Sequence, residues 1–348
     1  MAMKKILTFF AAALLLLGAT SACDKQPEGG GDTPAPKDFH VNPSSTTLLE
    51  LFQDQIDEYE NDATAPASRV YICAHRANTW SSADKKIPEN SIPCIEEAIA
   101  QGVDIVELDV RSTSDGVLML MHDESIAGTT NGSGKIQNLT FEKVRSYKMK
   151  YRGQSTPYEK DGQSIQVPTL VEALNACKGK VYVNLDVKNT TVSALMNAIH
   201  EAGSEEEVMI YGFNQSEKKE CIEWAIEKYG KFIAVHPYIS SPSECKTYQT
   251  VAWCDCAKLF QYDGSVFYNE TNPGFGCQCH GFGALSYSNS LNWDSQVRDW
   301  YNTYYLNDIE APCNVLDKFI ASGSDVIQTD LFELVELYMK SKGLRNVK

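Results

Sequence analysis

Short apolar runs alternate with helical patterns along most of this chain, and this alternation limits the folds that it can adopt. Eight runs have the length and composition of buried strands: 70–74, 103–110, 117–121, 181–187, 208–211, 232–235, 283–287 and 325–328. Strands separated by helices tend to pair in parallel, and eight of them close into a barrel of about 250 residues. For a chain of 348 residues, this pattern predicts an α/β protein with one (β/α)8 barrel and additional segments.

The helices between these runs have recognisable boundary signals. Asn90 is a good N-cap for a helix over 91–101, and Gly102 stops that helix. Thr169 and Glu172 have the spacing of a capping box at the start of the next predicted helix. We expect that helix over 170–177, and further helices over 46–60, 217–229 and 313–322. The helix over 46–60 is amphipathic and precedes the first strand, so it leads into the barrel.

The N-terminus resembles a bacterial export signal. Two lysines precede an apolar run over 6–17, which is too short to span a bilayer, and small residues then lead to Cys23. The small residues before Cys23 are similar to a lipoprotein cleavage box, although Thr20 stands where such boxes usually have Leu. We predict a signal peptide over 1–22, a lipid-bearing Cys23 in a tether over 23–43, and the barrel over 44–348. The protein would then be exported, as a periplasmic, outer-membrane or cell-surface lipoprotein; the alternative is an ordinary signal peptide cut near Ala22.

The cysteines and the net charge narrow the class of protein further. A formal charge of −15 argues against nucleic acid as a partner, because binding its phosphates requires a clustered basic face. A loop-like insertion over 238–282, too long for a barrel connection, carries two C-x-C pairs: Cys254, Cys256, Cys277 and Cys279. Disulfides are favoured there over zinc, because structural zinc sites usually have wider spacing. We expect Cys73, Cys94 and Cys177 to be buried free thiols.

Polar side chains stand at the ends of the first four predicted strands. They are His75 and Arg76, Glu107 and Asp109, His122 and Asp123, and Asp186 and Lys188. The members of the second and fourth pairs are two residues apart, so they point to the same side of their strand. In a (β/α)8 barrel the carboxyl ends of the strands surround one mouth, where active sites lie. Burying so many charges without partners would cost several kcal/mol each, which favours a functional site.

These residue types suit metal-assisted cleavage of a phosphate ester. Three carboxylates form a hard oxygen site of the kind that binds Mg²⁺ or Ca²⁺. Arg grips phosphate oxygens with two parallel hydrogen bonds, and Lys adds a point charge. Two histidines can share proton transfer between the nucleophile and the leaving alkoxide.

The ordered motifs resemble those of the glycerophosphodiester phosphodiesterase family. The matching stretches are His75-Arg76-Ala77, Pro88-Glu89-Asn90, Glu107-Leu108-Asp109, His122-Asp123, Thr129-Thr130-Asn131-Gly132, Asp186-Val187-Lys188 and Thr329-Asp330. The resemblance implies a TIM barrel that hydrolyses glycerophosphodiesters to an alcohol and sn-glycerol 3-phosphate. It also implies a role for each matched residue: His75 and His122 as the acid/base pair, Glu107, Asp109 and Asp186 as ligands of one divalent cation, Arg76 as phosphate ligand, with Lys188 and Glu89 supporting the site.

Three positions depart from the family pattern. Ala77 replaces a Gly, Gly128 stands where the loop usually has Arg, and Asp186 replaces the usual Glu. Asp at that last position is similar to the spider-venom phospholipase D branch. Two alternatives therefore stay open: a phospholipase D- or C-like enzyme acting on lipid or phosphoinositol headgroups, and a non-catalytic surface lipoprotein that binds a ligand.

Overall fold

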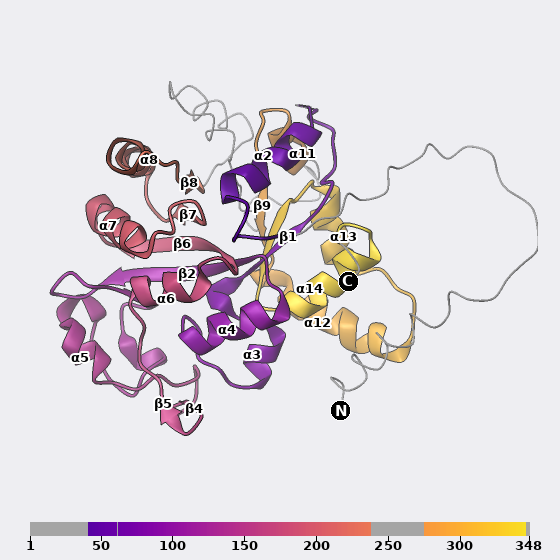
Figure 1. Ribbon diagram of the computed structural model, residues 1–348. Coiled ribbons are helices and arrows are strands. Elements are labelled where there is room, and N and C mark those ends of the chain that lie inside the picture. Colours follow the sequence, from indigo (N-terminus) through magenta and orange to yellow (C-terminus); the bar gives the residue numbers. More distant parts are fainter. Residues whose placement is uncertain (1–40, 61, 238–274, 346–348) are drawn as a thin grey trace, which may run out of the picture. The chain divides into compact units, whose positions relative to one another are not determined.

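The computed structural model describes residues 41–60, 62–237 and 275–345 (Figure 1). The described barrel strands form one curled parallel sheet in the order β8-β7-β6-β2-β1-β10-β9. Their bounds are β1 (Tyr71–Ala74), β2 (Ile105–Ser112), β6 (Tyr182–Asn189), β7 (Val208–Tyr211), β8 (Ala234–Val235), β9 (Tyr287–Asn289) and β10 (Val326–Thr329). The helices that surround them are α4 (Ile92–Gln101), α6 (Leu170–Cys177), α7 (Val192–Ala202), α8 (Gln215–Tyr229), α12 (Asp294–Thr303), α13 (Asn314–Ala321) and α14 (Phe332–Ser341). This architecture is the predicted (β/α)8 TIM barrel.

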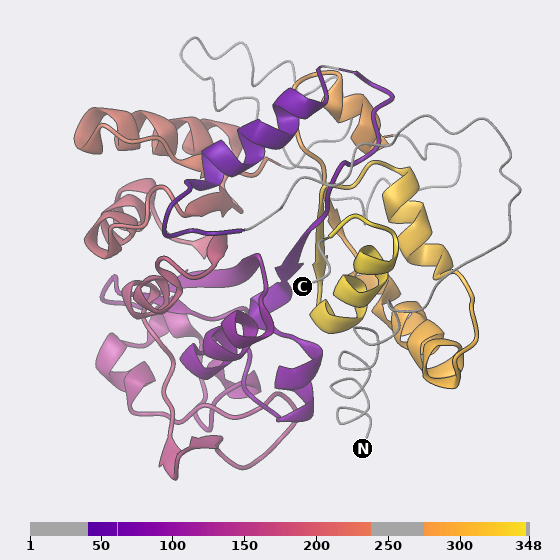
Figure 2. The same ribbon diagram turned by 45° about the vertical axis from the view of Figure 1, so that its right-hand side comes forward.

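Alternate residues of each strand belong to two separate cores. On β1, Ile72 faces the surrounding helices, whereas Tyr71 and Cys73 face the barrel interior. Both views of the ribbon show the helices outside the strands (Figures 1 and 2). Inside, the ring of His236, directly after β8, lies 4.2 Å from that of Tyr287 on β9. The two ends of the described sheet therefore meet across the barrel interior.

Helix α2 (Leu48–Glu58) covers the amino ends of the strands and confirms the helix predicted over 46–60. Thr47 and Glu50 form a capping box at its start. Its buried side chains, Leu48 and Phe52 among them, belong to the same interior cluster as Tyr71 and other strand residues. With this end closed by apolar packing, the opposite mouth is the one where polar groups gather.

The third predicted strand does not join the parallel barrel. β3 (Leu118–Leu120) pairs antiparallel with β2, with Val110 opposite Leu120. β2 continues past the rim of the sheet to Ser112, and β3 folds back against that extension. The chain thus returns to the mouth, where the Met121 N–H donates to the Asp109 carbonyl 3.0 Å away. His122 reaches the site by this return, and not by the parallel strand that the sequence predicted.

Several element boundaries differ from the sequence predictions. Ser91, and not Asn90, caps α4, because its hydroxyl accepts from the N–H of Cys94. β9 begins at Tyr287, where the predicted strand ends. Part of the predicted loop-like insertion is instead helix α11 (Phe275–His280), which begins beyond the undescribed stretch.

The cysteine predictions are confirmed in part. Cys73, Cys94 and Cys177 are buried free thiols, as expected. Cys277 and Cys279 are buried in α11, whereas Cys254 and Cys256 lie outside the described residues. Disulfide or metal binding by this group therefore stays a prediction, as do the signal peptide, the tether and Cys23.

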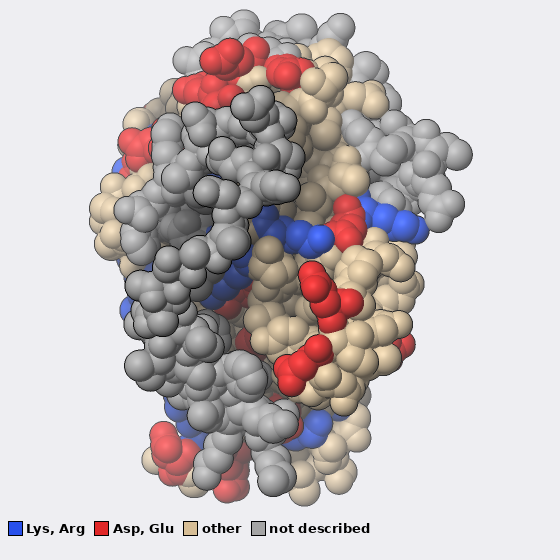
Figure 3. Space-filling model, turned by 90° about the vertical axis from the view of Figure 1, so that its right-hand side faces the viewer, with Lys and Arg blue, Asp and Glu red and all other residues tan. Residues whose placement is uncertain are grey.

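Four shorter elements lie between those of the barrel. They are α3 (Trp80–Asp84), α5 (Phe141–Arg145), β4 (Glu159–Lys160) and β5 (Gln163–Ser164). No helix within the described ranges is long and apolar enough to cross a bilayer. On the face drawn in Figure 3, basic side chains stand in small groups beside acidic ones, and the described part of this face has no continuous basic surface.

Candidate active site

Three carboxylates converge at the mouth of the barrel from two neighbouring strands. Glu107 and Asp109 come from β2 and Asp186 from β6, and Asp109 is the direct register partner of Asp186. One carboxylate oxygen from each of the three lies within 4.8 Å of the others. The sequence prediction that these three groups come together is confirmed.

The electrostatics of this cluster favour a bound cation. Burial raises the pKa of Glu107 well above its usual range, and the charges of Asp109 and Asp186 add to that effect. Burial disfavours the Lys188 ammonium, but Asp109 and Asp186 outweigh it and raise its pKa. Lys188 Nζ lies 3.2 Å from Asp109 Oδ1 and Arg76 Nε lies 3.5 Å from Asp109 Oδ2, so the charge of the three carboxylates is only partly neutralised. A hard divalent cation with oxygen ligands would neutralise the remaining charge, and the three side chains have the chemistry that Mg²⁺ and Ca²⁺ require.

Each of the two predicted catalytic histidines is held by a carboxylate at the same ring atom. His75 Nδ1 lies 3.0 Å from Asp330 Oδ1, and His122 Nδ1 lies 2.7 Å from Asp123 Oδ1. A carboxylate accepts the Nδ1 proton, so both rings keep Nε2 for other contacts. The two rings line the same cavity of about 170 Å³ as the three carboxylates. We refer to this cavity as the inner well.

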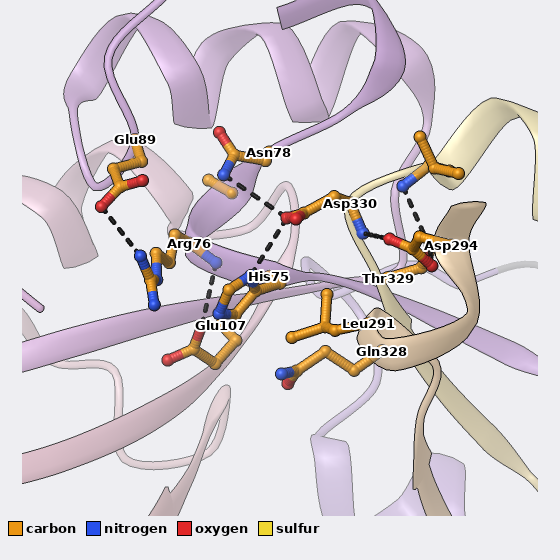
Figure 4. Close-up of polar contacts among 12 residues, drawn as sticks. His75, Arg76, Asn78, Glu89, Glu107, Leu291, Asp294, Gln328, Thr329 and Asp330 are labelled. Carbon is orange, nitrogen blue, oxygen red and sulfur yellow. Dashed lines mark hydrogen bonds and ion pairs between the residues drawn. The ribbon is translucent and has the colours of Figure 1, made fainter. Parts of the chain in front are cut away.

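Arg76 and Ala77 occupy a strained turn directly after His75. Their φ angles are +53° and +61°, in the left-handed region that costs most residues about 1–2 kcal/mol. The turn lets the Arg76 N–H donate to Glu107 Oε2 at 2.8 Å (Figure 4). The Arg76 side chain meanwhile bonds Glu89 Oε1 through Nη1 at 3.0 Å. The backbone at this turn therefore holds a predicted metal ligand while the side chain is kept at the mouth.

The sequence predicts Asn90 as a helix N-cap, but in the structure its side chain binds Asp109. Its φ of +52° turns the side chain toward β2. There Nδ2 donates to Asp109 Oδ2 at 2.8 Å, and Oδ1 accepts from the Asp109 N–H at 3.1 Å. Asn90 thus fixes both the backbone and the carboxylate of Asp109.

Sequence reasoning missed Arg152, which bridges two acidic residues of the site. Its Nη2 lies 2.6 Å from Glu89 Oε1, and its Nη1 lies 2.8 Å from Asp123 Oδ2. Burial opposes ionisation of Asp123, but hydrogen bonds from Arg152 and His122 outweigh it and lower the pKa of that carboxyl to about 2. No motif includes Arg152, and its one signal in the sequence is indirect: Gly128 stands where the family pattern has a cation.

Asp294 on α12 is a second group that the sequence did not single out. Its Oδ2 accepts from the Asp330 N–H at 3.0 Å, and its Oδ1 accepts from the Thr329 hydroxyl at 3.0 Å (Figure 4). Burial raises the pKa of Asp294 to about 6, although the Asp330 N–H acts in the opposite direction. Asp294 therefore anchors the segment from which Asp330 orients His75.

A second cavity, of about 460 Å³, lies beside the inner well. We call it the outer pocket. It is adjacent to the site, because its lining includes Glu89, Arg152 and Asp330. Arg298 lies over the ring of Trp80 at 5.0 Å from its centroid, and both residues also line the pocket. The mouth thus offers a small chamber at the carboxylates and a larger one next to it.

The fold and the site define a (β/α)8 barrel with an acidic cluster, two carboxylate-held histidines and basic side chains at one mouth. Residues 75–224 of this barrel match the sequence model of the glycerophosphoryl diester phosphodiesterase family. A glycerophosphodiester phosphodiesterase from Caldanaerobacter subterraneus subsp. tengcongensis is 31% identical over 159 residues, which are 42% of this chain and 59% of that protein. Glycerophosphodiester phosphodiesterase 1 of Mus musculus is 36% identical over 124 residues, 35% of each chain. The similarity thus spans less than two-thirds of these relatives.

Solved structures share the fold over most of the chain. A glycerophosphoryl diester phosphodiesterase from Parabacteroides distasonis has a TM-score of 0.61 at 20% identity, over 84% of this chain and 94% of that one. A phosphodiesterase from Oleispira antarctica, solved in complex with the product sn-glycerol-3-phosphate, has a TM-score of 0.53 at 18% identity, over 78% and 97% of the two chains. These likenesses establish the barrel fold.

Proposed function

We propose that this protein hydrolyses glycerophosphodiesters to an alcohol and sn-glycerol 3-phosphate with the help of one divalent cation. The observation that carries the proposal is the convergence of Glu107, Asp109 and Asp186 in the same inner well as two carboxylate-held histidines. The similarity of residues 75–224 to the phosphodiesterase family supports the same reaction.

The three carboxylates would hold the cation, Mg²⁺ or Ca²⁺, which when bound polarises a phosphoryl oxygen. Arg76 would bind a second phosphate oxygen, since Glu89 already holds its guanidinium at the mouth. Lys188, bonded to both Asp109 and Asp186, would limit the negative charge that the phosphate meets. Together these groups surround the phosphate with positive charge in an otherwise acidic protein.

His75 and His122 would carry out proton transfer. Because Asp330 and Asp123 fix the Nδ1 atoms, each histidine acts through Nε2. One Nε2 takes a proton from a water molecule whose oxygen bonds to phosphorus, and the other donates a proton to the alkoxide oxygen as its bond to phosphorus breaks. The outer pocket next to His75 and Asp330 would accommodate the alcohol that leaves.

We also propose that the protein is exported and attached to a membrane through lipid on Cys23. The apolar run, the small residues before Cys23 and the Gly- and Pro-rich tether over 23–43 support this proposal. Intact-mass analysis of protein extracted from its native membrane tests it. We expect a mature chain that begins at Cys23 and carries acyl mass; another N-terminus, or an unmodified Cys23, would contradict it.

A panel of glycerophosphodiesters, assayed with and without Mg²⁺ or Ca²⁺, tests the proposed reaction. We expect release of sn-glycerol 3-phosphate that depends on the added metal. Release of a cyclic phosphate or an inositol phosphate would instead favour the phospholipase D- or C-like alternative. Binding of the substrates without turnover would favour a ligand-binding protein.

A further inference from the structure

The floor of the inner well is built from polar residues that no motif of the sequence includes. Asn184 on β6 and His236 after β8 are 1% and 3% exposed, and both line the well beside the carboxylates, with Asn184 the register partner of Glu107. Asn184 Nδ2 lies 3.3 Å from His236 Nδ1 and 3.3 Å from the Tyr287 hydroxyl. The floor therefore connects β6, β8 and β9 through one side-chain amide.

The direction of these hydrogen bonds is set by their neighbours. The Tyr287 hydroxyl donates to Gln328 Oε1, so it accepts from Asn184, which fixes Nδ2 as the amide atom that faces it. The same Nδ2 then donates to His236 Nδ1, which is an acceptor. Burial lowers the pKa of His236 well below its usual range, so the ring is neutral and its proton is on Nε2.

Two atoms of this floor have no hydrogen-bond partner among the described residues. They are His236 Nε2, a donor, and Asn184 Oδ1, an acceptor. A buried polar atom without a partner costs about 1–3 kcal/mol, so a pair of them indicates a site for a ligand or water. One donor beside one acceptor is the hydrogen-bonding complement of an alcohol hydroxyl, which both accepts and donates.

The inner well is large enough to hold a substrate group. A water needs a cavity of roughly 10–15 Å³, whereas the inner well has about 170 Å³. The same cavity is lined by both catalytic histidines and all three carboxylates. A phosphate held at the carboxylates would therefore have Asn184 and His236 beside it in the same cavity, where a short hydroxyl-bearing chain can reach them.

We propose that His236 and Asn184 bind a free hydroxyl of the glycerol part of the substrate. The donor at Nε2 and the acceptor at Oδ1 select phosphodiesters whose inner group carries that hydroxyl, while the outer pocket receives the other alcohol. This inference rests on the proposed function and assigns the glycerol end of the substrate to the inner well. His236 lies outside the segment that matches the phosphodiesterase family, which ends at residue 224.

Binding of two small phosphates, measured by calorimetry in the presence of Mg²⁺, tests the inference without turnover. The probes are sn-glycerol 3-phosphate and propyl phosphate, which has the same carbon chain without the hydroxyls. We expect the wild-type protein to prefer glycerol phosphate by about tenfold or more, because a site built to pair a hydroxyl rejects a ligand that lacks it. Equal affinity for the two probes, or binding of neither, would overturn the inference.

Variants at position 236 assign the preference to the proposed atoms. His236→Phe removes the donor and keeps a ring, and should reduce the preference by about tenfold. His236→Gln can donate from its side-chain amide and should keep part of the preference. His200→Phe is the matched control, since His200 lies on the outside of α7 against Tyr229, and it should retain the wild-type ratio. Thermal unfolding of each variant verifies that it is folded.

The outcomes separate this inference from the proposed reaction. A wild-type ratio in folded His236→Phe, or an equal loss of affinity for both probes, would contradict a hydroxyl-binding floor even if the enzyme is active. If the preference depends on His236 but no phosphodiester is cleaved, the binding assignment holds and the proposed hydrolysis fails.

Discussion

The guanidinium of Arg152 lies over Gly128, with Nη1 3.1 Å from the position that a Cβ atom on Gly128 would occupy. The sequence shows a missing Arg at Gly128 relative to the family pattern. Arg152 brings a guanidinium to the same place from a later loop, and it bonds Glu89 and Asp123 there. The cation that the motif lacks is thus present in the structure.

Replacing Arg152 by Ala should lower kcat/KM for a glycerophosphodiester by about tenfold to a hundredfold. The substitution removes hydrogen bonds between charged groups worth about 1.5–3 kcal/mol and releases Glu89, which holds Arg76. Steady-state kinetics of Arg152→Ala and of the control Arg145→Ala test this, because Arg145 pairs with Glu172 elsewhere. An Arg152→Ala enzyme with wild-type kinetics would contradict the assignment.

A second pair of variants tests whether an Arg at position 128 can replace Arg152. Gly128→Arg alone should impair activity, because its Cβ would lie 3.1 Å from Arg152 Nη1 and 3.2 Å from Asp123 Oδ2. In the Arg152→Ala background the space is vacated, so Gly128→Arg should recover part of the lost kcat/KM. Additive losses in the double variant would show that the two positions do not exchange this role.

The barrel fold and the gathering of the three carboxylates at one mouth followed from sequence, because both depend on short local patterns. Glu107 and Asp109 are two apart on one strand, so they must share a face. The direct pairing of β2 with β6, which brings Asp186 beside Asp109, was not predicted, because the strand over 117–121 was expected to join the barrel between them. By contrast, Arg152 and Asp294 reach the site from a loop and an outer helix, and no spacing relates them to their partners. The antiparallel direction of β3 could not be predicted either, since an apolar run does not specify strand direction.

For Asn90, the residue type indicated a special backbone position, but the sequence could not show which one. Asn is favoured both at N-caps and at positive φ, and the sequence cannot separate the two. The structure assigns the cap to Ser91 and gives Asn90 to Asp109. His236 was missed for a similar reason, because a lone His after a short strand has no pattern that distinguishes it.

His75→Ala and His122→Ala should each lower kcat by about 10²-fold or more, the usual contribution of acid–base catalysis. Asp330→Asn should cause a smaller loss, because the ring of His75 remains but its Nδ1 loses a charged partner. Kinetics with folded protein, verified by circular dichroism, measure these effects. Near-wild-type turnover in either His variant would show that the role is misassigned.

Removal of the metal should abolish activity reversibly. We expect loss of turnover in a chelator and recovery on addition of Mg²⁺ or Ca²⁺, because the three carboxylates would otherwise repel one another. In calorimetric titrations the wild type and Asp299→Ala, which changes an exposed residue of α12, should bind one ion per chain. Asp109→Ala should lose this binding; full activity of a metal-stripped sample in chelator would contradict the cation requirement.

Asp294 should make the protein less stable as pH rises from about 4 to 7. Its pKa is about 6 in the folded protein and near 3.8 when unfolded, so the folded state binds the proton more tightly over this interval. Stability that is present below pH 4 is therefore lost as pH rises through 6, by about 3 kcal/mol. Urea unfolding of wild type and Asp294→Asn at both ends of the interval tests this. Relative to wild type, Asp294→Asn should have a higher free energy of unfolding at pH 7 than at pH 4. The same difference between the two proteins at both pH values would contradict the prediction.

We expect the carboxylate–histidine site to hydrolyse a glycerophosphodiester. Phosphorus NMR of a glycerophosphodiester incubated with the protein and Mg²⁺ or Ca²⁺ tests it most directly, with His122→Ala as the comparison. We predict that the diester signal is replaced by that of sn-glycerol 3-phosphate with the wild type and persists with His122→Ala. An unchanged diester signal with metal-loaded wild type, or the same product at the same rate from both proteins, would contradict the account.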